Sequence, residues 1–102
     1  MHPDIWGDAT WLYLHCLTFS YPNNPPEEYK KRAVLFFNNL LLPCETCQNE
    51  YDKYIQLHPF TEEIVSSKDN IIRCFFDFHN AVDKRIGHPT LDFQQLLINI
   101  TQ

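Results

Sequence analysis

The chain has 102 residues, which suits a single domain over residues 1–102, and its 44% hydrophobic content is enough for a core. A net charge of -5 argues against a nucleic-acid-binding protein, since such proteins usually carry a basic patch. No GxGxxG or GxxxxGK(S/T) stretch, secretory signal or apolar run of membrane-spanning length is present, so we expect a cytosolic protein without a membrane span.

Helical periodicity dominates the first half of the chain. Pro3 and Asp4 mark a helix start, and apolar residues then recur three and four positions apart at Ile5, Ala9, Leu12, Cys16 and Phe19. The segment YPNNPP, residues 21–26, ends this helix and forms a loop. A second helix is predicted over residues 26–42, because it opens with a proline and two acidic residues and is stopped by Pro43.

Helical segments also account for the second half of the chain. The pattern predicts a helix from Cys44 to about His58, a turn region with a short helical piece over residues 58–70, a long helix over 66–86 that Gly87 and Pro89 stop, and a last helix over 90–100. The strand candidates are short and lack alternation. We therefore predict an all-α helix bundle.

The sequence PCETC, residues 43–47, places two cysteines three positions apart at a predicted helix start. Unpaired backbone N–H groups and the positive end of the helix dipole lower the pKa of a thiol there. Cys44 and Cys47 share one face of the helix, so their sulfur atoms can form a disulfide. Since a lowered pKa also makes a good leaving group, the motif favours an exchangeable disulfide.

Three other interpretations of this dithiol stay open at this point. A zinc site would need two further ligands, whereas Cys16 and Cys74 are isolated and the histidines lack the spacing of a zinc finger. A thioredoxin-like redox motif would lie beside a βαβ pattern, which this chain lacks. The last interpretation is a pair of inert core cysteines, for which a helix start is an unusual place.

One face of the first predicted helix has the composition of a binding surface for a flat ligand. A glycine gives room for close approach, a tryptophan offers a flat surface and a histidine can hydrogen bond, at spacings of four, four and three along Gly7, Trp11, His15 and Thr18. The simpler interpretation is a core tryptophan beside a histidine with its hydrogen bonds satisfied. Taken alone, the pattern favours the simpler interpretation.

The long fourth helix carries a second stripe of this kind, made of Phe75, His79, Val82 and Ile86. Its end is dense in side chains that could grip a nucleotide. These are His79 and Asn80 for ring edges, Asp83 for a ribose hydroxyl, and Lys84, Arg85 and His88 for phosphates. The simpler interpretation is a helix end with cations near its negative terminus.

Taken together, these segments resemble the Erv/ALR family of FAD-dependent sulfhydryl oxidases along nearly the whole chain. The matching stretches come in order as WGDATWLYLH (6–15), YP (21–22), PCETC (43–47) with Tyr51, HNAVDKRIGHP (79–89) and LD (91–92). The short length and the WGxxxW opening look most like the compact versions that large DNA viruses carry.

The resemblance implies a four-helix bundle with a short fifth helix, FAD bound at the bundle mouth and a homodimer. It implies that a dithiol passes two electrons to the CxxC disulfide, then to FAD and then to O2, which yields a disulfide and hydrogen peroxide. Cys44 would meet the substrate, and Cys47 would lie against the isoalloxazine ring. The implied FAD contacts are Gly7, Trp11, His15, Tyr51, His79, Asn80, Val82, Asp83 and His88, to which the phosphate assignments above add Lys84 and Arg85. No metal is implied.

Two departures from the family pattern concern charge near the phosphates. Asp83 stands where the family usually has asparagine; it still accepts from a ribose hydroxyl but adds a negative charge. His88 stands where the family has lysine, which weakens phosphate pairing at neutral pH.

A third departure concerns disulfides. Phe76 and Phe93 match the positions of a structural disulfide in cellular members, so we expect apolar packing to replace that bond. Cys16 and Cys74 are then left unpaired. We expect both to be buried thiols, because free cysteine often acts as a small core residue.

The resemblance also bears on partners and location. Cellular members often carry a second dithiol on a flexible tail, whereas this chain has no second CxxC. We expect direct reaction with a small dithiol carrier or a substrate protein, with O2 as acceptor. For a viral protein, the expected setting is the host cytoplasm or the virion, with disulfide formation in virion proteins. The alternatives are a helical zinc-binding interaction module that uses the CxxC and a flavin-free helical interaction domain.

Overall fold

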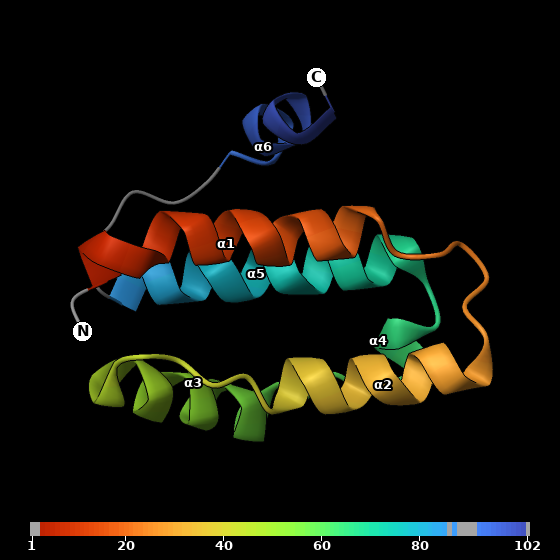
Figure 1. Ribbon diagram of the computed structural model, residues 1–102, viewed down its shortest axis with the longest axis horizontal. Helices are drawn as coiled ribbons and strands as arrows, with labels where there is room; N and C mark the ends of the chain where they lie inside the picture. Colours follow the sequence, from red (N-terminus) through yellow and green to blue (C-terminus); the bar gives the residue numbers. More distant parts are fainter. Residues whose placement is uncertain (1–2, 86, 88–91, 102) are drawn as a thin grey trace.

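The structure is a computed structural model that describes residues 3–85, 87 and 92–101. Helices are the only regular secondary structure among its described residues, as predicted: α1 (Pro3–Phe19), α2 (Glu27–Asn38), α3 (Glu45–Leu57), α4 (Glu62–Val65), α5 (Lys68–Arg85) and α6 (Phe93–Thr101). The four long helices α1, α2, α3 and α5 make up the bundle, α4 is a single turn, and α6 is the short additional helix. In Figure 1, α1 and α5 lie side by side across from the layer of α2 and α3.

The second helix is shorter than predicted, because it ends at Asn38 and not near Leu42. The side chain of Asn39 donates to the Leu35 carbonyl at 2.8 Å, and its backbone leaves the helical region. Side chains of α3 then provide hydrogen-bond acceptors for the backbone N–H groups of the extended chain that follows. The Leu40 N–H donates to the Tyr51 hydroxyl at 3.2 Å, and the Leu42 N–H donates to Gln48 Oε1 at 2.7 Å. Tertiary hydrogen bonds thus replace the last predicted turn.

Most other helix ends fall within two residues of the prediction, and capping groups explain the differences. The Ser67 side chain caps the start of α5, because its hydroxyl oxygen accepts a hydrogen bond from the Asn70 N–H at 3.3 Å. Gly87 follows α5 with a φ of 75°, which only glycine adopts without strain, so the predicted glycine stop is confirmed. Asp92 caps α6 by accepting from the Gln95 N–H at 3.1 Å. The predicted roles of Ile86, His88 and Pro89 lie outside the described residues.

Aromatic rings fill the core between the two layers. Phe75 is fully buried at the centre of α5, and its ring lies 5.6 Å from that of Phe78 and 5.9 Å from that of Phe37 on α2. The hydroxyl of buried Tyr51 donates to the Phe37 carbonyl. These contacts tie α2, α3 and α5 together directly beneath the site described below.

The apolar stripe that predicts α1 lies on its outer face. Ile5 is 75% exposed and Leu12 is 58% exposed, and Ala9 and Cys16 on the same face are also exposed. The prediction that Cys16 is buried is therefore wrong, since it belongs to this outward stripe. Cys74 is half-buried on α5, and burial raises the pKa of its thiol.

The short helix α6 is held by aromatic packing. This agrees with the expectation that Phe76 and Phe93 replace a disulfide of cellular members. The rings of Phe76 on α5 and Phe93 on α6 meet edge to face at 5.1 Å. The guanidinium of Arg73 lies 3.9 Å from the centre of the Phe93 ring, a favourable cation–π distance. Apolar and cation–π contacts therefore occupy the place where a covalent link is expected in cellular members.

Candidate functional site: a dithiol beside an aromatic pocket

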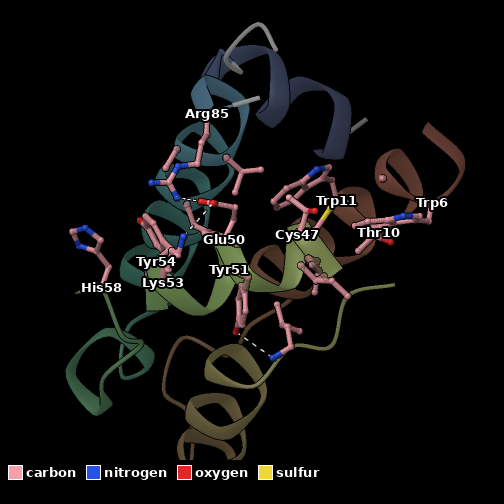
Figure 2. Close-up of a pocket in the computed structure, with 18 of the residues that line it drawn as sticks. Trp6, Thr10, Trp11, Cys47, Glu50, Tyr51, Lys53, Tyr54, His58 and Arg85 are labelled. Atoms are coloured by element: carbon pink, nitrogen blue, oxygen red, sulfur yellow. Dashed lines mark hydrogen bonds and ion pairs between the residues drawn. The ribbon is translucent and has the colours of Figure 1, made fainter. Parts of the chain in front are cut away.

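A pocket of about 360 Å³ opens between α1, α3 and α5 and the extended segment that precedes α3. Aromatic side chains make up much of its wall, as Figure 2 shows in part: Trp6, Trp11, Tyr51, Tyr54 and Phe78. Leucines and a valine fill much of the rest, and few polar groups reach it. Apolar walls with a few placed polar groups are typical of sites for flat cofactors.

The pocket wall brings together several residues that the sequence singles out. From three different helices these are Gly7, Trp11, Cys47, Tyr51, Val82 and Arg85. The wall does not include the other predicted cofactor residues within the described part of the chain, which are His15, His79, Asn80, Asp83 and Lys84. His88 lies outside the described residues.

Gly7 is buried, yet its missing side chain faces open space. A Cβ atom built on Gly7 meets no heavy atom within 4 Å outside its own helix neighbourhood. Because Gly7 lines the pocket, this space belongs to the pocket. The glycine thus widens the pocket.

Two histidines form a layer behind Trp11. The rings of Trp11 and His79 stack at 3.7 Å with an interplanar angle of 8°, and His79 Nδ1 lies 2.7 Å from His15 Nε2. On the other side of its ring, His79 Nε2 lies 3.5 Å from a carboxylate oxygen of Asp83. The two predicted stripes of α1 and α5 therefore face each other and meet here.

His15 is held neutral in this layer. Burial lowers its pKa to about 4, because the surroundings disfavour the charged ring. Its Nδ1 atom is buried and has no hydrogen-bond partner among the described residues. A buried polar atom without a partner is uncommon, and here it belongs to the ring whose other nitrogen contacts His79.

The dithiol lies where α3 begins. Cys44 is the residue before the helix, and its sulfur accepts a hydrogen bond from the Cys47 N–H at 3.3 Å, in the manner of a helix cap. Both thiols are free. Cys47 points to the pocket (Figure 2), whereas Cys44 is not part of the pocket wall.

The two thiols differ in their tendency to ionise. Hydrogen bonds from the Cys47 side chain and then from its backbone N–H lower the pKa of Cys44. Burial raises the pKa of Cys47 to about 11, and hydrogen bonding and charge repulsion from Cys44 act in the same direction. The lowered pKa expected at this helix start is therefore found at Cys44 alone, which makes it the better nucleophile.

This difference predicts selective alkylation. In the reduced protein near pH 8, iodoacetamide is expected to label Cys44 at least about ten times faster than Cys47. Labelling of Cys44 should also reach half its maximal rate at a lower pH than labelling of Cys47, because its thiolate forms first as pH rises. Peptide mass spectrometry of timed samples measures both rates, and faster labelling of Cys47 would contradict the assignment.

Several pocket residues were missed from the sequence. They include Glu50, Lys53 and Tyr54 on α3, and His58 directly after it. Glu50, Tyr54 and His58 follow Cys47 by three, seven and eleven positions, the spacing of one helix face. The same spacing rule predicted the stripes on the first and fourth helices. Applied to the third helix, it identifies Glu50, Tyr54 and His58 as well.

The structure gives no support to a zinc site. Within residues 3–85, 87 and 92–101, no three His, Cys, Asp or Glu side chains come together in a way that could hold a metal ion. Cys16 lies on the outer face of α1, away from the dithiol pocket. The fold and site together define a helical domain with a dithiol beside an aromatic pocket, and Cys47 of that dithiol lies on the pocket wall.

The chain belongs to the Erv1/Alr family, whose family model matches residues 8–101. It is 34% identical over 99 residues to a probable FAD-linked sulfhydryl oxidase of Acanthamoeba polyphaga mimivirus, an alignment that covers 95% of this chain and 69% of the relative. It is 38% identical over 95 residues to a putative FAD-linked sulfhydryl oxidase of Invertebrate iridescent virus 6, which covers 87% of this chain and 86% of that protein.

Cellular relatives and solved structures agree with this result. The chain is 30% identical to the mitochondrial FAD-linked sulfhydryl oxidase of Saccharomyces cerevisiae, of which the match covers only 48%. Its fold matches the crystal structure of the FAD-binding domain of yeast Erv1 with a TM-score of 0.81 and 29% identity, over 90% of this chain and 87% of that structure. The predicted family and bundle are therefore confirmed.

Proposed function

We propose that this chain is an FAD-dependent sulfhydryl oxidase, which converts two thiols and O2 into a disulfide and hydrogen peroxide. The observation that carries the proposal is the placement of Cys47 on the wall of an aromatic pocket, with the more acidic Cys44 beside it at the helix start. When bound there, FAD supplies the chemistry that takes two electrons from the dithiol and passes them to O2.

The residues present fit a flavin dinucleotide. Trp11, Tyr51 and Val82 provide flat and apolar walls, and Gly7 provides the extra space. Cations at the end of α5 suit a phosphate group, which supports the assignment of Lys84 and Arg85. The layer of His15 and His79, together with Asp83, is assigned to support and hydrogen bonding of the cofactor. Asn80 and His88 keep their assignments from the family pattern alone.

The dithiol would work by thiol–disulfide exchange. A substrate thiolate attacks Cys44 Sγ in the Cys44–Cys47 disulfide, which forms a mixed disulfide and releases the Cys47 thiolate. The second substrate thiol, after losing its proton, attacks the substrate sulfur that is bonded to Cys44 in the mixed disulfide. This forms the substrate disulfide and releases the Cys44 thiolate. The substrate leaves oxidised by two electrons, and Cys44 and Cys47 are reduced by two. The position of Cys44 outside the pocket wall and of Cys47 on it supports this division of roles.

The first experiment is a visible absorption spectrum before and after a dithiol is added under limited oxygen. A flavin band that bleaches with the dithiol and returns in air is expected. A protein that stays colourless after FAD is added and then removed by desalting would overturn the proposal.

The pocket predicts a contrast between two changes at Gly7. Gly7→Leu is expected to reduce bound FAD at least about tenfold, because its side chain enters the space that the cofactor needs. Gly7→Ala adds a Cβ that meets no protein atom, and alanine is favoured over glycine in a helix by up to about 1 kcal/mol. The alanine variant should therefore unfold no earlier than wild type on heating. The absorbance ratio of flavin to protein measures occupancy, and equal occupancy in both variants would contradict the placement.

A homodimer formed through α1 is part of the proposal. The outer face of α1 is apolar over Ile5, Ala9 and Leu12, and an exposed apolar stripe of this kind often marks an interface. Leu12→Lys is expected to shift the mass in sedimentation equilibrium from dimer to monomer. Ile98→Lys on α6 makes the same chemical change outside this face and should stay dimeric. A wild-type monomer at micromolar concentration would remove dimerisation from the proposal.

The proposal extends to the setting of the reaction. No helix in the described part of the chain is long and apolar enough to cross a bilayer. The viral relatives named above support a viral protein that acts in host cytoplasm or in the virion. Its electron donors would be a dithiol carrier or virion proteins that receive their disulfides from it.

A further inference from the structure

Three charged side chains meet at the pocket wall and connect α3 to α5. Arg85 Nη1 donates to Glu50 Oε2, and Lys53 Nζ lies 3.8 Å from Glu50 Oε1 (Figure 2). All three residues line the pocket, and Glu50 is the only carboxylate among its lining residues in the described part of the chain. A single acidic side chain thus holds two cations at the wall of a mostly apolar pocket.

These ion pairs are weak enough to be exchanged. The side chain of Arg85 is 57% exposed, that of Lys53 is 68% exposed and that of Glu50 is 33% exposed. Exposed ion pairs contribute little to stability, since water screens them and ordering two long side chains costs entropy. A ligand with more negative charge than one carboxylate can therefore take over both cations.

We propose that Glu50 acts as an internal competitor of the cofactor's diphosphate, and that Lys53 joins Arg85 in binding that diphosphate once Glu50 is displaced. The inference rests on the proposed function, because it takes the cofactor to be a dinucleotide. A diphosphate offers several acceptor oxygens and more than one negative charge, and the fork of an arginine matches a phosphate better than an isolated carboxylate contact does. Lys53 and Glu50 are then residues that set cofactor affinity.

A role of Glu50 in positioning Arg85 for the cofactor would predict the opposite change in FAD affinity. If Glu50 merely positions Arg85 for the cofactor, removing its charge would loosen Arg85 and weaken binding. If it competes with the diphosphate, removing its charge frees both cations and strengthens binding. The sign of the change in affinity separates the two.

The test compares the FAD dissociation constants of Glu50→Gln, Lys53→Gln and wild type. Each holoprotein is diluted into FAD-free buffer, and the fluorescence of released FAD is read at equilibrium over a range of salt concentrations. We expect Glu50→Gln to lower the dissociation constant roughly threefold to tenfold and Lys53→Gln to raise it by a similar factor. Glu28→Gln on α2 makes the same charge change away from the pocket and should leave it within about twofold.

A double variant shows whether the two residues act through each other. In the Lys53→Gln background, the gain from Glu50→Gln should shrink, because one of the two cations that Glu50 holds is gone. Raising the salt concentration should also reduce the differences between variants, since the contacts are partly exposed.

The outcomes separate this inference from the proposed function. An unchanged or raised dissociation constant in Glu50→Gln overturns the competitor role, although the protein still binds FAD and oxidises dithiols. An unchanged constant in Lys53→Gln overturns the assignment of Lys53. Failure of the wild-type protein to bind FAD would instead overturn the proposed function itself.

Discussion

Replacing Cys47 with serine is expected to lower the rate of dithiol oxidation at least about a thousandfold while the protein keeps its FAD. Serine has nearly the same size as cysteine, so the pocket wall keeps its shape. A hydroxyl cannot form the disulfide through which electrons leave the substrate, so the path to the pocket is interrupted. Oxygen consumption with dithiothreitol measures the rate, and the flavin absorbance of the same sample measures the cofactor.

The matched control is Cys16→Ser. It removes a thiol with the same substitution, but on the outer face of α1 and away from the pocket. This variant should oxidise dithiols at close to the wild-type rate. Substantial activity in the Cys47 variant would refute the assigned role, whereas loss of flavin would show that Cys47 mainly shapes the pocket.

The second large effect is expected at Phe75. This ring is fully buried, and it lies 5.8 Å from the Trp11 ring, 4.9 Å from the His15 ring and 5.6 Å from the Phe78 ring. Phe75→Ala leaves a cavity beneath the pocket and should lower the free energy of unfolding by about 3–5 kcal/mol. Whole domains are stable by only about 5–15 kcal/mol, so this single change removes a large part of the total.

Urea unfolding followed by circular dichroism measures this loss. Phe75→Leu keeps most of the volume and should cost less, about 1–2 kcal/mol, so it gives a value even if the alanine variant does not fold. Leu35→Ala on the exposed face of α2 should change stability by no more than about 0.5 kcal/mol. A loss at Phe75 no larger than at Leu35 would contradict its place in the core.

Helix type and order could be predicted from the sequence because local signals set them. Proline and acidic residues begin α2, a glycine ends α5, and three- and four-residue spacing runs through all the long helices. The end of α2 could not be predicted, because it depends on hydrogen bonds to residues further along the chain. The Leu40 N–H donates to the Tyr51 side chain, and the Leu42 N–H donates to the Gln48 side chain. Local propensity contains no information about such partners.

The candidate site could be predicted in part, because some of its residues stand out in the sequence. Gly7, Trp11, Cys47 and Tyr51 carry distinctive chemistry in a recognisable order, and the structure gathers them around one pocket. The spacing of Glu50 from Cys47 places it on the pocket face of α3, but its residue type does not mark it, since acidic residues are common on helix surfaces. Its importance follows from its pairing with Arg85, which lies 35 positions away.

Burial on α1 shows where periodicity can mislead. The spacing of Ile5, Ala9, Leu12 and Cys16 correctly predicts a helix, but these residues face outward. The inward face carries Leu14, His15 and Thr18, two of which are polar. Thr18 is tolerated there because its hydroxyl donates to the His15 carbonyl at 2.8 Å. An apolar stripe therefore identifies a helix more safely than it identifies the core.

The contact between Phe76 and Phe93 has a consequence for the order of events after synthesis. All four cysteines of the chain are free, so no covalent cross-link is needed to dock α6 on α5. A newly made molecule in a thiol-rich compartment can reach its folded form before any oxidant is present. The proposed thiol oxidase would thereby need no disulfide of its own to dock α6, so its folding would not depend on its own product.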